Sequence, residues 1–277
     1  MKEFFGFGGY TRIPEGYFSP EHLLFVSGFM AVMVALAIFF GKKYRHAPDE
    51  LKNRVLVVAA ILIDAFELFK IVLLCIRYAD PMAWKLELPL FLCSIQLITI
   101  PLAAFAKGRV KEAALDFVLI FGILGAVLGT YLAGNNYSCY PVLSFDNTVS
   151  AITHSISGFS SLYIAISGMA SMKKENTALT FAILLPFCIA AYVANVLIPY
   201  NYMFLMRGDG TPYDILYNLL GGNAVLYPIS VVLLFLVYIV AFRTVYSCIL
   251  GKCSTSQRAT VKSEEENKIW KIYYSTG

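Results

Sequence analysis

The chain has 277 residues, of which 58% are hydrophobic and only 14% charged, and its mean hydropathy is +0.68. Soluble domains are about one quarter charged, so this composition excludes an ordinary soluble protein and indicates an integral, multi-pass membrane protein. The net charge of +4 is small, and the basic residues of the chain lie between apolar stretches. Both observations argue against a nucleic-acid-binding protein.

Seven apolar segments follow one another along the chain, each close to the ~20 residues that a helix needs to cross about 30 Å of hydrocarbon. Lipid offers no partner for backbone amides, and long unalternating apolar runs are not typical of a membrane barrel. We therefore expect an all-α fold with seven transmembrane helices in one bundle. The segments cover residues 22–40, 55–76, 86–106, 113–133, 149–172, 177–199 and 224–249. Residues 1–250 would form one domain, and residues 251–277 a polar cytoplasmic tail.

The basic residues predict one orientation for all seven segments. Lys and Arg concentrate after the first, third and fifth segments and in the tail, at Lys42, Lys43, Arg45, Lys52, Arg54, Lys107, Arg109, Lys111, Lys173, Lys174, Arg243, Lys252, Arg258, Lys262, Lys268 and Lys271. Because basic connections stay in the cytoplasm, we expect the N-terminus outside and the C-terminus inside. Asn136 then begins an N-glycosylation sequon on the outer side.

Targeting and metal signals are sparse. The first 16 residues lack the apolar core of a cleavable signal peptide, so none is expected. Six cysteines occur without a CxxC pair, and we expect neither a metal site nor a disulfide framework, and no cofactor. Cys248 and Cys253 near the inner surface could be palmitoylated, but we interpret them as ordinary thiols.

The second segment carries three ionisable residues, Asp64, Glu67 and Lys70, within one broad helix face. Charges at this depth should face the bundle interior and largely neutralise one another. Lys70 could stabilise a thiolate or bind a lipid phosphate, and a purely structural Glu67–Lys70 pair is the alternative. The same three groups could instead carry an ion or a substrate charge in a transporter.

The third segment places one thiol inside a membrane-length apolar run. A helix over 86–106 would align Pro89, Cys93, Gln96 and Ile100 on one face. Cys93 would lie seven residues in, or roughly 10 Å below the outer surface at 1.5 Å per residue. A polar group at such depth marks a candidate functional site.

The fourth segment contains Gly122, Gly125 and Gly129, a spacing that favours close helix packing over chemistry. Asp116, at its inner end, is expected to be solvated. The fifth segment supplies the only histidine that we expect to be buried, His154, roughly 8 Å below the outer surface by the same rise. Ser150, on the same helical stripe as His154, begins a row of small residues that lets another helix approach.

The matching depths of Cys93 and His154 predict a pair in which the imidazole takes the thiol proton, because the thiolate is the nucleophile. The alternative is a buried thiol beside a histidine that only joins helices. After the sixth segment, Asn195, Asn201 and Tyr202 lie toward the outer mouth, where they could orient an ester or a head group.

The stretch LPLFLCS around Cys93, the single His154, the NYMFL stretch and Tyr227-Pro228 together resemble the YwaF-like family of integral membrane proteins, which includes animal transmembrane protein 164. The resemblance covers nearly all seven segments in order. It implies an acyltransferase that moves an acyl chain onto a lysophospholipid, with Cys93 as the nucleophile and His154 as its partner. The bacterial pattern usually has His at the position of Phe91, so a second imidazole is missing here.

The leading hypothesis is therefore a lipid acyltransferase or acyl hydrolase whose partners are membrane phospholipids and lysophospholipids. Gln96, Asn195 or Asn201 would donate to the oxyanion. A transporter using Asp64 and its neighbours is the alternative. A seven-helix receptor is disfavoured, because the third segment has no acidic-Arg motif at its inner end and the seventh has no Asn-Pro-x-x-Tyr run.

Overall fold

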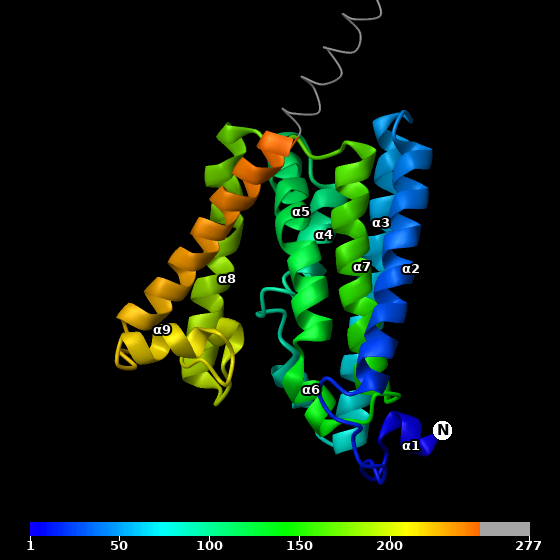
Figure 1. Cartoon of the computed structure of the whole chain (residues 1–277), viewed down its shortest axis with the longest axis vertical. Helices are drawn as coiled ribbons and strands as arrows, with labels where there is room; N and C mark the ends of the chain where they lie inside the picture. The colour runs from blue at the N-terminus through cyan, green and yellow to red at the C-terminus, as the bar shows by residue number, and fades with distance from the viewer. Residues whose placement is uncertain (250–277) are drawn as a thin grey trace, which may run out of the picture. The chain divides into compact units, whose positions relative to one another are not determined.

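A computed structural model describes residues 1–249, and the polar tail expected over 251–277, with Cys253, lies outside the described residues. Within the described part all regular structure is helical and no strand occurs, which confirms the all-α class (Figure 1). The elements are α1 (Lys2–Phe5), α2 (Pro20–Tyr44), α3 (Asp49–Tyr78), η1 (Ala83–Glu87), α4 (Gln96–Phe105), α5 (Gly108–Tyr131), α6 (Gly134–Cys139), α7 (Phe145–Ser167), η2 (Lys174–Asn176), α8 (Thr177–Leu197), η3 (Tyr202–Phe204) and α9 (Tyr213–Leu219), followed by a helix over Leu226–Ile249.

The chain divides into two compact units, Met1–Leu234 and Phe235–Gly277. The first unit holds every labelled helix, from α1 to α9. The described part of the second unit is the second half of the helix Leu226–Ile249. The single domain expected over residues 1–250 stays a prediction.

Five helices are long and apolar enough to cross a membrane: Pro20–Tyr44, Gly108–Cys139, Phe145–Ser167, Lys174–Leu197 and Leu226–Ile249. This agrees with a membrane protein that crosses the bilayer several times. The helix α3 has 30 residues and thus ample length, but its apolar stretch includes three charged side chains. The third expected segment contributes only the ten-residue helix α4.

The expectation of one continuous helix over residues 86–106 is wrong. After η1 ends at Glu87 the chain is extended at Leu88, and it forms turns until α4 begins at Gln96. Pro89 explains the extended residue before it, because proline disfavours helical geometry there. Ser94 then accepts a hydrogen bond from the Phe91 N–H through Oγ at 2.9 Å, which replaces a helical bond. The predicted helical stripe through Cys93 and Gln96 therefore does not exist.

The closest helix contact joins α5 and α7. Ser161 Oγ donates to the Leu119 carbonyl at 2.7 Å and Ser157 Oγ donates to the Gly122 carbonyl at 3.3 Å. A Cβ added to Gly122 would meet the Ser157 carbonyl at 2.7 Å, too close for any side chain. The interpretation of the glycines as a packing surface is confirmed, because small residues let two backbones approach this closely.

Two polar side chains are more buried than the sequence predicts. His22 is fully buried, where Nδ1 accepts the Phe18 N–H at 3.1 Å and Nε2 lies 3.1 Å from the Thr130 carbonyl. His22 is thus the buried histidine, whereas the side chain of His154 is only partly buried, so the expectation that His154 alone is buried is wrong. Asp116 is also buried and accepts the Met172 N–H at 3.0 Å, so the expectation of a solvated carboxylate is wrong. Backbone groups take the place of water as hydrogen-bond partners of both side chains. Hydropathy along the sequence does not reveal such partners.

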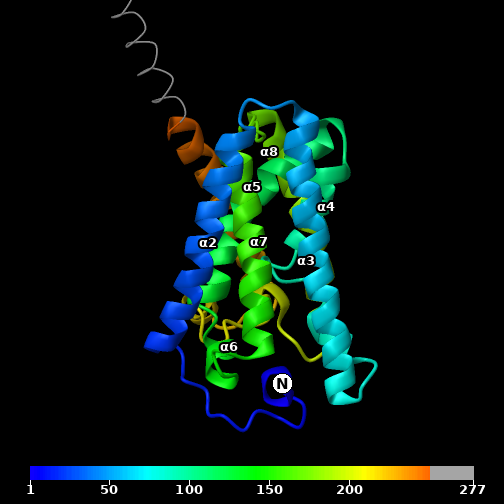
Figure 2. The same ribbon diagram turned by 90° about the vertical axis from the view of Figure 1, so that its right-hand side faces the viewer.

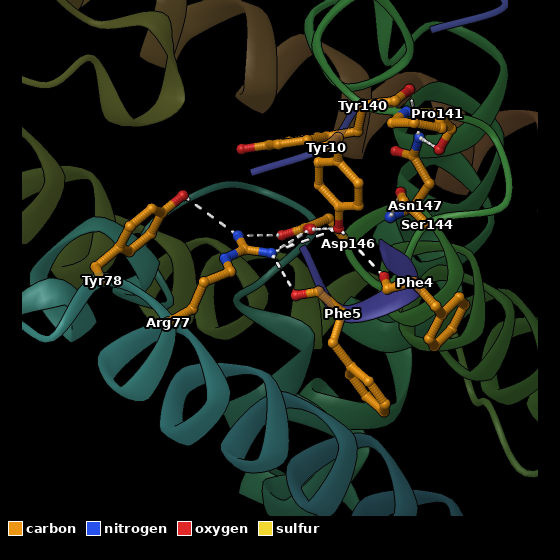
Figure 3. Close-up of polar contacts among 10 residues, drawn as sticks. All are labelled: Phe4, Phe5, Tyr10, Arg77, Tyr78, Tyr140, Pro141, Ser144, Asp146 and Asn147. Atoms are coloured by element: carbon orange, nitrogen blue, oxygen red, sulfur yellow. Dashed lines mark hydrogen bonds and ion pairs between the residues drawn. The ribbon is translucent and has the colours of Figure 1, made fainter. Parts of the chain in front are cut away.

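The N-terminal segment crosses the ends of the helices before α2 begins (Figure 2). It is held by Arg77 at the end of α3 and Asp146 at the start of α7, which form a two-pronged ion pair at 2.7 and 2.8 Å (Figure 3). Tyr10 donates to the same carboxylate, and Arg77 donates to the Phe5 carbonyl at 3.3 Å. Burial and the neighbouring carboxylate raise the pKa of Tyr10, so its hydroxyl keeps its proton at neutral pH.

We expect Asp146→Asn to lower the free energy of unfolding by about 3–5 kcal/mol, because Arg77 would keep its charge in a buried site without a counter-ion. Both side chains are well buried, at 5% and 11% exposed for Arg77 and Asp146. Tyr10→Phe is the control, since it removes one hydrogen bond worth about 1 kcal/mol. Denaturant unfolding of the full chain in detergent measures both, and an equal loss in the two variants would contradict the importance of the ion pair.

Candidate active site at the break before α4

Cys93 lies in the turn between Leu88 and α4, two residues before the N-cap of that helix. Its Cβ faces α5, since a Cβ placed on Gly125 would lie 3.2 Å from it. Reactive cysteines are often placed like this, just before the start of a helix, where backbone N–H groups point outward.

His154 is held by its own helix, α7. Nδ1 lies 2.7 Å from the carbonyl oxygen of Ser150, and the Ser150 hydroxyl lies 3.4 Å from the same nitrogen. A carbonyl oxygen can only accept, so Nδ1 carries the proton. The neutral ring then has its lone pair on Nε2, which is the atom a general base needs.

The structure brings Cys93 and His154 together from different parts of the chain. The Cys93 thiol and the His154 imidazole interact with each other, and they lie against Gly125 and Gly129, two glycines one turn apart on α5. Nε2 is buried and has no hydrogen-bond partner among the described residues. A free imidazole nitrogen next to a thiol is the arrangement in which a proton could pass from sulfur to nitrogen.

Two glycines of α5 make room for this pair. A Cβ on Gly129 would overlap the His154 ring at Nε2, and a Cβ on Gly125 would press on Cys93. The sequence predicted these glycines only as packing residues. Their spacing of four was the available signal, because residues four apart share a helix face.

Gln96 supplies one unused donor close to the thiol in sequence. It is fully buried, and Oε1 accepts the Thr99 hydroxyl at 3.0 Å. Its Nε2 has no hydrogen-bond partner. Buried amide donors are rarely left unpaired, so this one is available for a group that the site would bind.

Lys70 does not present a free charge. Its ammonium lies 2.8 Å from Glu67 on the same helix and 2.8 Å from Glu87 at the end of η1. The Glu67–Lys70 pair considered in the sequence is present, and Glu87 is a second partner that the sequence did not reveal. Lys70 is therefore already occupied and is not free to bind a lipid phosphate. Asp64 is exposed on α3 and has no ion pair among the described residues.

Asn195, Asn201 and Tyr202 shape the loop after α8. Asn195 accepts the Tyr202 N–H at 2.6 Å and donates to the Tyr202 carbonyl at 3.0 Å, whereas Asn201 accepts the Met206 N–H at 2.9 Å and donates to the Arg207 carbonyl at 2.8 Å. Both amides are occupied by the loop backbone, so the expectation that they donate to an oxyanion is not supported.

Tyr202 connects this loop to the segment of the thiol. Its hydroxyl donates to the Lys85 carbonyl in η1 at 2.7 Å, and its ring lies 5.2 Å from the ring of Phe91. Phe91 also meets Tyr200 and Phe204, at 5.9 and 6.0 Å between ring centroids. Phe91 thus anchors the turn two residues before Cys93.

Within residues 1–249, no three His, Cys, Asp or Glu side chains gather as a metal site would require. The candidate site is built from side chains and backbone groups around Cys93 and His154.

A family model, described as the TMEM164 family, matches residues 17–246. The chain belongs to the TMEM164 family. The relation to transmembrane protein 164 that the sequence indicated is thereby confirmed. No curated protein and no solved structure matches the chain. The region shared with the TMEM164 family includes the Cys93 turn, the α5 glycines and His154, so the whole candidate site lies inside it.

We expect Gly129→Ala to displace the His154 ring and to slow alkylation of Cys93 at least about tenfold, since a positioned base contributes 10²–10⁴-fold to such proton transfers. The measurement is the rate at which a membrane-permeant maleimide labels Cys93 in the full chain, followed by mass spectrometry of the Cys93 peptide. Gly28→Ala on α2 is the control, because a Cβ there meets nothing within 4 Å. Unchanged labelling in Gly129→Ala would show that Nε2 does not act on the thiol.

Proposed function

We propose that this member of the TMEM164 family is a membrane-embedded lipid acyltransferase or acyl hydrolase that forms an acyl thioester on Cys93. The observation that carries the proposal is the pairing of the Cys93 thiol with an imidazole whose Nδ1 proton is held by the Ser150 carbonyl and whose Nε2 is free. That pairing orients the lone pair of Nε2 for one task, the removal of a proton from a neighbour. The resemblance to the YwaF-like family implies the same activity.

In the first half-reaction, His154 Nε2 accepts the Cys93 proton and the sulfur attacks the ester carbonyl of a phospholipid. The C=O π electrons move to oxygen and form a tetrahedral oxyanion. Gln96 Nε2 donates to that oxygen, together with the N–H groups beside the thiol. The C–O ester bond then breaks, and the imidazolium returns its proton to the leaving alcohol. A lysophospholipid departs and the acyl group stays on sulfur.

In the second half-reaction, His154 Nε2 takes a proton from the hydroxyl of an acceptor lysophospholipid or from water. The acceptor oxygen attacks the thioester carbonyl, and the C–S bond breaks after the second tetrahedral intermediate. The thiolate recovers the proton from the imidazolium, so the enzyme returns to its starting state. The acceptor decides whether the net reaction is acyl transfer or hydrolysis.

The membrane arrangement belongs to the same proposal. We infer seven crossings, with α3 and the broken segment that includes α4 added to the five apolar helices. The 30 residues of α3 extend about 45 Å at 1.5 Å per residue, which is enough for a bilayer. Irregular backbone is tolerated at membrane depth where protein surrounds it. The N-terminus outside and the C-terminus inside follow from the basic connections, and phospholipids would then reach Cys93 from the outer leaflet.

A second candidate function is transport by the charged face of α3. One observation favours it: Asp64 is exposed on a membrane-length helix and has no ion pair among residues 1–249. Carboxylates at such depth usually line an ion or substrate path. This candidate requires that Asp64→Asn abolish function while Cys93→Ser leaves it intact.

We expect Cys93→Ser to abolish acyl exchange between phospholipid and lysophospholipid, because a serine hydroxyl ionises far less readily than a thiol and an oxygen ester is harder to cleave than a thioester. Purified protein incubated with phospholipid should gain the mass of one acyl chain on Cys93. Cys188→Ser is the control, since Cys188 is a free thiol on another membrane-length helix, α8, and is not part of the pair with His154. Full exchange activity in Cys93→Ser would refute the proposed function.

We expect Gln96→Leu to lower kcat about 10²-fold with little change in KM, as the loss of one oxyanion donor does elsewhere. Thr99→Val is the control, because it removes only the partner of Gln96 Oε1. Steady-state exchange kinetics separate the two parameters. A larger effect of Thr99→Val than of Gln96→Leu would mean that the amide matters for packing and not for the oxyanion.

A further inference from the structure

Lys70 is held between two carboxylates that belong to different parts of the chain. Glu67 lies one turn earlier on α3, so its 2.8 Å contact with Lys70 is local. Glu87 ends η1, and its 2.8 Å contact with Lys70 joins α3 to the segment that leads to Cys93. The three side chains are only 12–29% exposed, so water screens these contacts weakly.

The segment between Glu87 and α4 has little internal order of its own. Its internal backbone bonds are a turn from the Leu90 N–H to the Leu88 carbonyl and one from the Ile95 N–H to the Phe91 carbonyl. At the α4 end, the Cys93 and Ser94 carbonyls also accept the N–H groups of Gln96 and Leu97. A segment without regular backbone hydrogen bonds is held in position by its two ends and by its side-chain contacts. One end continues into α4. The other is tied to α3 by Glu87 and to the loop after α8 by the Lys85 carbonyl.

His154 lies on α7, which packs against α3. The helix α3 thus contacts the element that holds the base and, through Lys70, the segment that holds the thiol. The Lys70–Glu87 ion pair therefore sets the position of the segment with the thiol relative to the helix with the base.

We propose that Lys70 is a positioning residue, whose bond to Glu87 fixes the Cys93 turn so that the thiol faces His154 Nε2. The inference rests on the proposed function, which requires the thiol to be held beside the imidazole. Without the ammonium, Glu67 and Glu87 become two carboxylates at a site with no cation between them. Their repulsion moves η1 away from α3, and the Cys93 turn moves with it.

The test compares four variants of the purified full chain: Lys70→Met, Lys70→Arg, Glu87→Gln and Glu67→Gln. Two quantities are measured for each, the maleimide labelling rate of Cys93 between pH 6 and 9 and the kcat and KM of acyl exchange. Thermal unfolding of the same samples reports any loss of folding. Glu67→Gln is the matched control, because it removes one carboxylate from Lys70 but leaves the bond to η1 in place.

Lys70→Met and Glu87→Gln are expected to slow Cys93 labelling and kcat at least tenfold, with KM changed less than threefold. Glu67→Gln should stay within twofold of the unmodified chain, and Lys70→Arg should restore labelling because it keeps the charge. Equal effects of Glu87→Gln and Glu67→Gln would overturn the proposal. The proposal would also be overturned if labelling fell in every variant in proportion to a lower unfolding temperature, since general loss of folding would then explain the effect.

The labelling rate separates this inference from the proposed function. If Cys93→Ser keeps full acyl exchange, the acyl-transfer proposal fails, and the labelling of Cys93 in the four variants still shows whether Lys70 positions the thiol. If Cys93→Ser is inactive but Lys70→Met labels like the unmodified chain, the acyl-transfer proposal stands and the role of Lys70 is refuted.

Discussion

The close contact between α5 and α7 is the constraint on which the site depends. Ser157 and Ser161 donate to carbonyl groups of α5, and Gly122 leaves no space for a side chain between the two helices. Because the helices approach so closely there, the next glycines on α5 face His154 and Cys93 at contact distance. The packing that holds the helices together is continuous with the packing that holds the candidate catalytic pair.

Hydropathy predicted the helices that are uniformly apolar, because length and composition alone decide whether a segment suits hydrocarbon. It could not predict the break before α4. Residues 86–106 are mostly apolar. Hydropathy indicates that such a segment suits the membrane interior, but it does not determine the backbone conformation there. Pro89 and the Ser94 hydroxyl are the local causes, and Pro89 was the visible signal.

The candidate site was predictable to different degrees for each residue. Cys93 and His154 are unusual in their segments, and their depths matched. The partners of Gln96, Asn195 and Lys70 are distant in sequence or are backbone atoms, so no pattern in one sequence could reveal them. Asn195 illustrates the limit, since an outer-loop amide suits a substrate and a loop backbone equally well, and the fold gives it the backbone.

The orientation of His154 has a consequence for how this site tolerates change. The acceptor of its Nδ1 proton is a main-chain carbonyl one turn earlier in α7, where other hydrolytic sites use a carboxylate side chain. No substitution of a side chain removes a main-chain oxygen. The imidazole therefore keeps its tautomer for as long as α7 stays helical, and the proposed reaction needs no third acidic side chain to orient it. The helix itself takes the place of that acid.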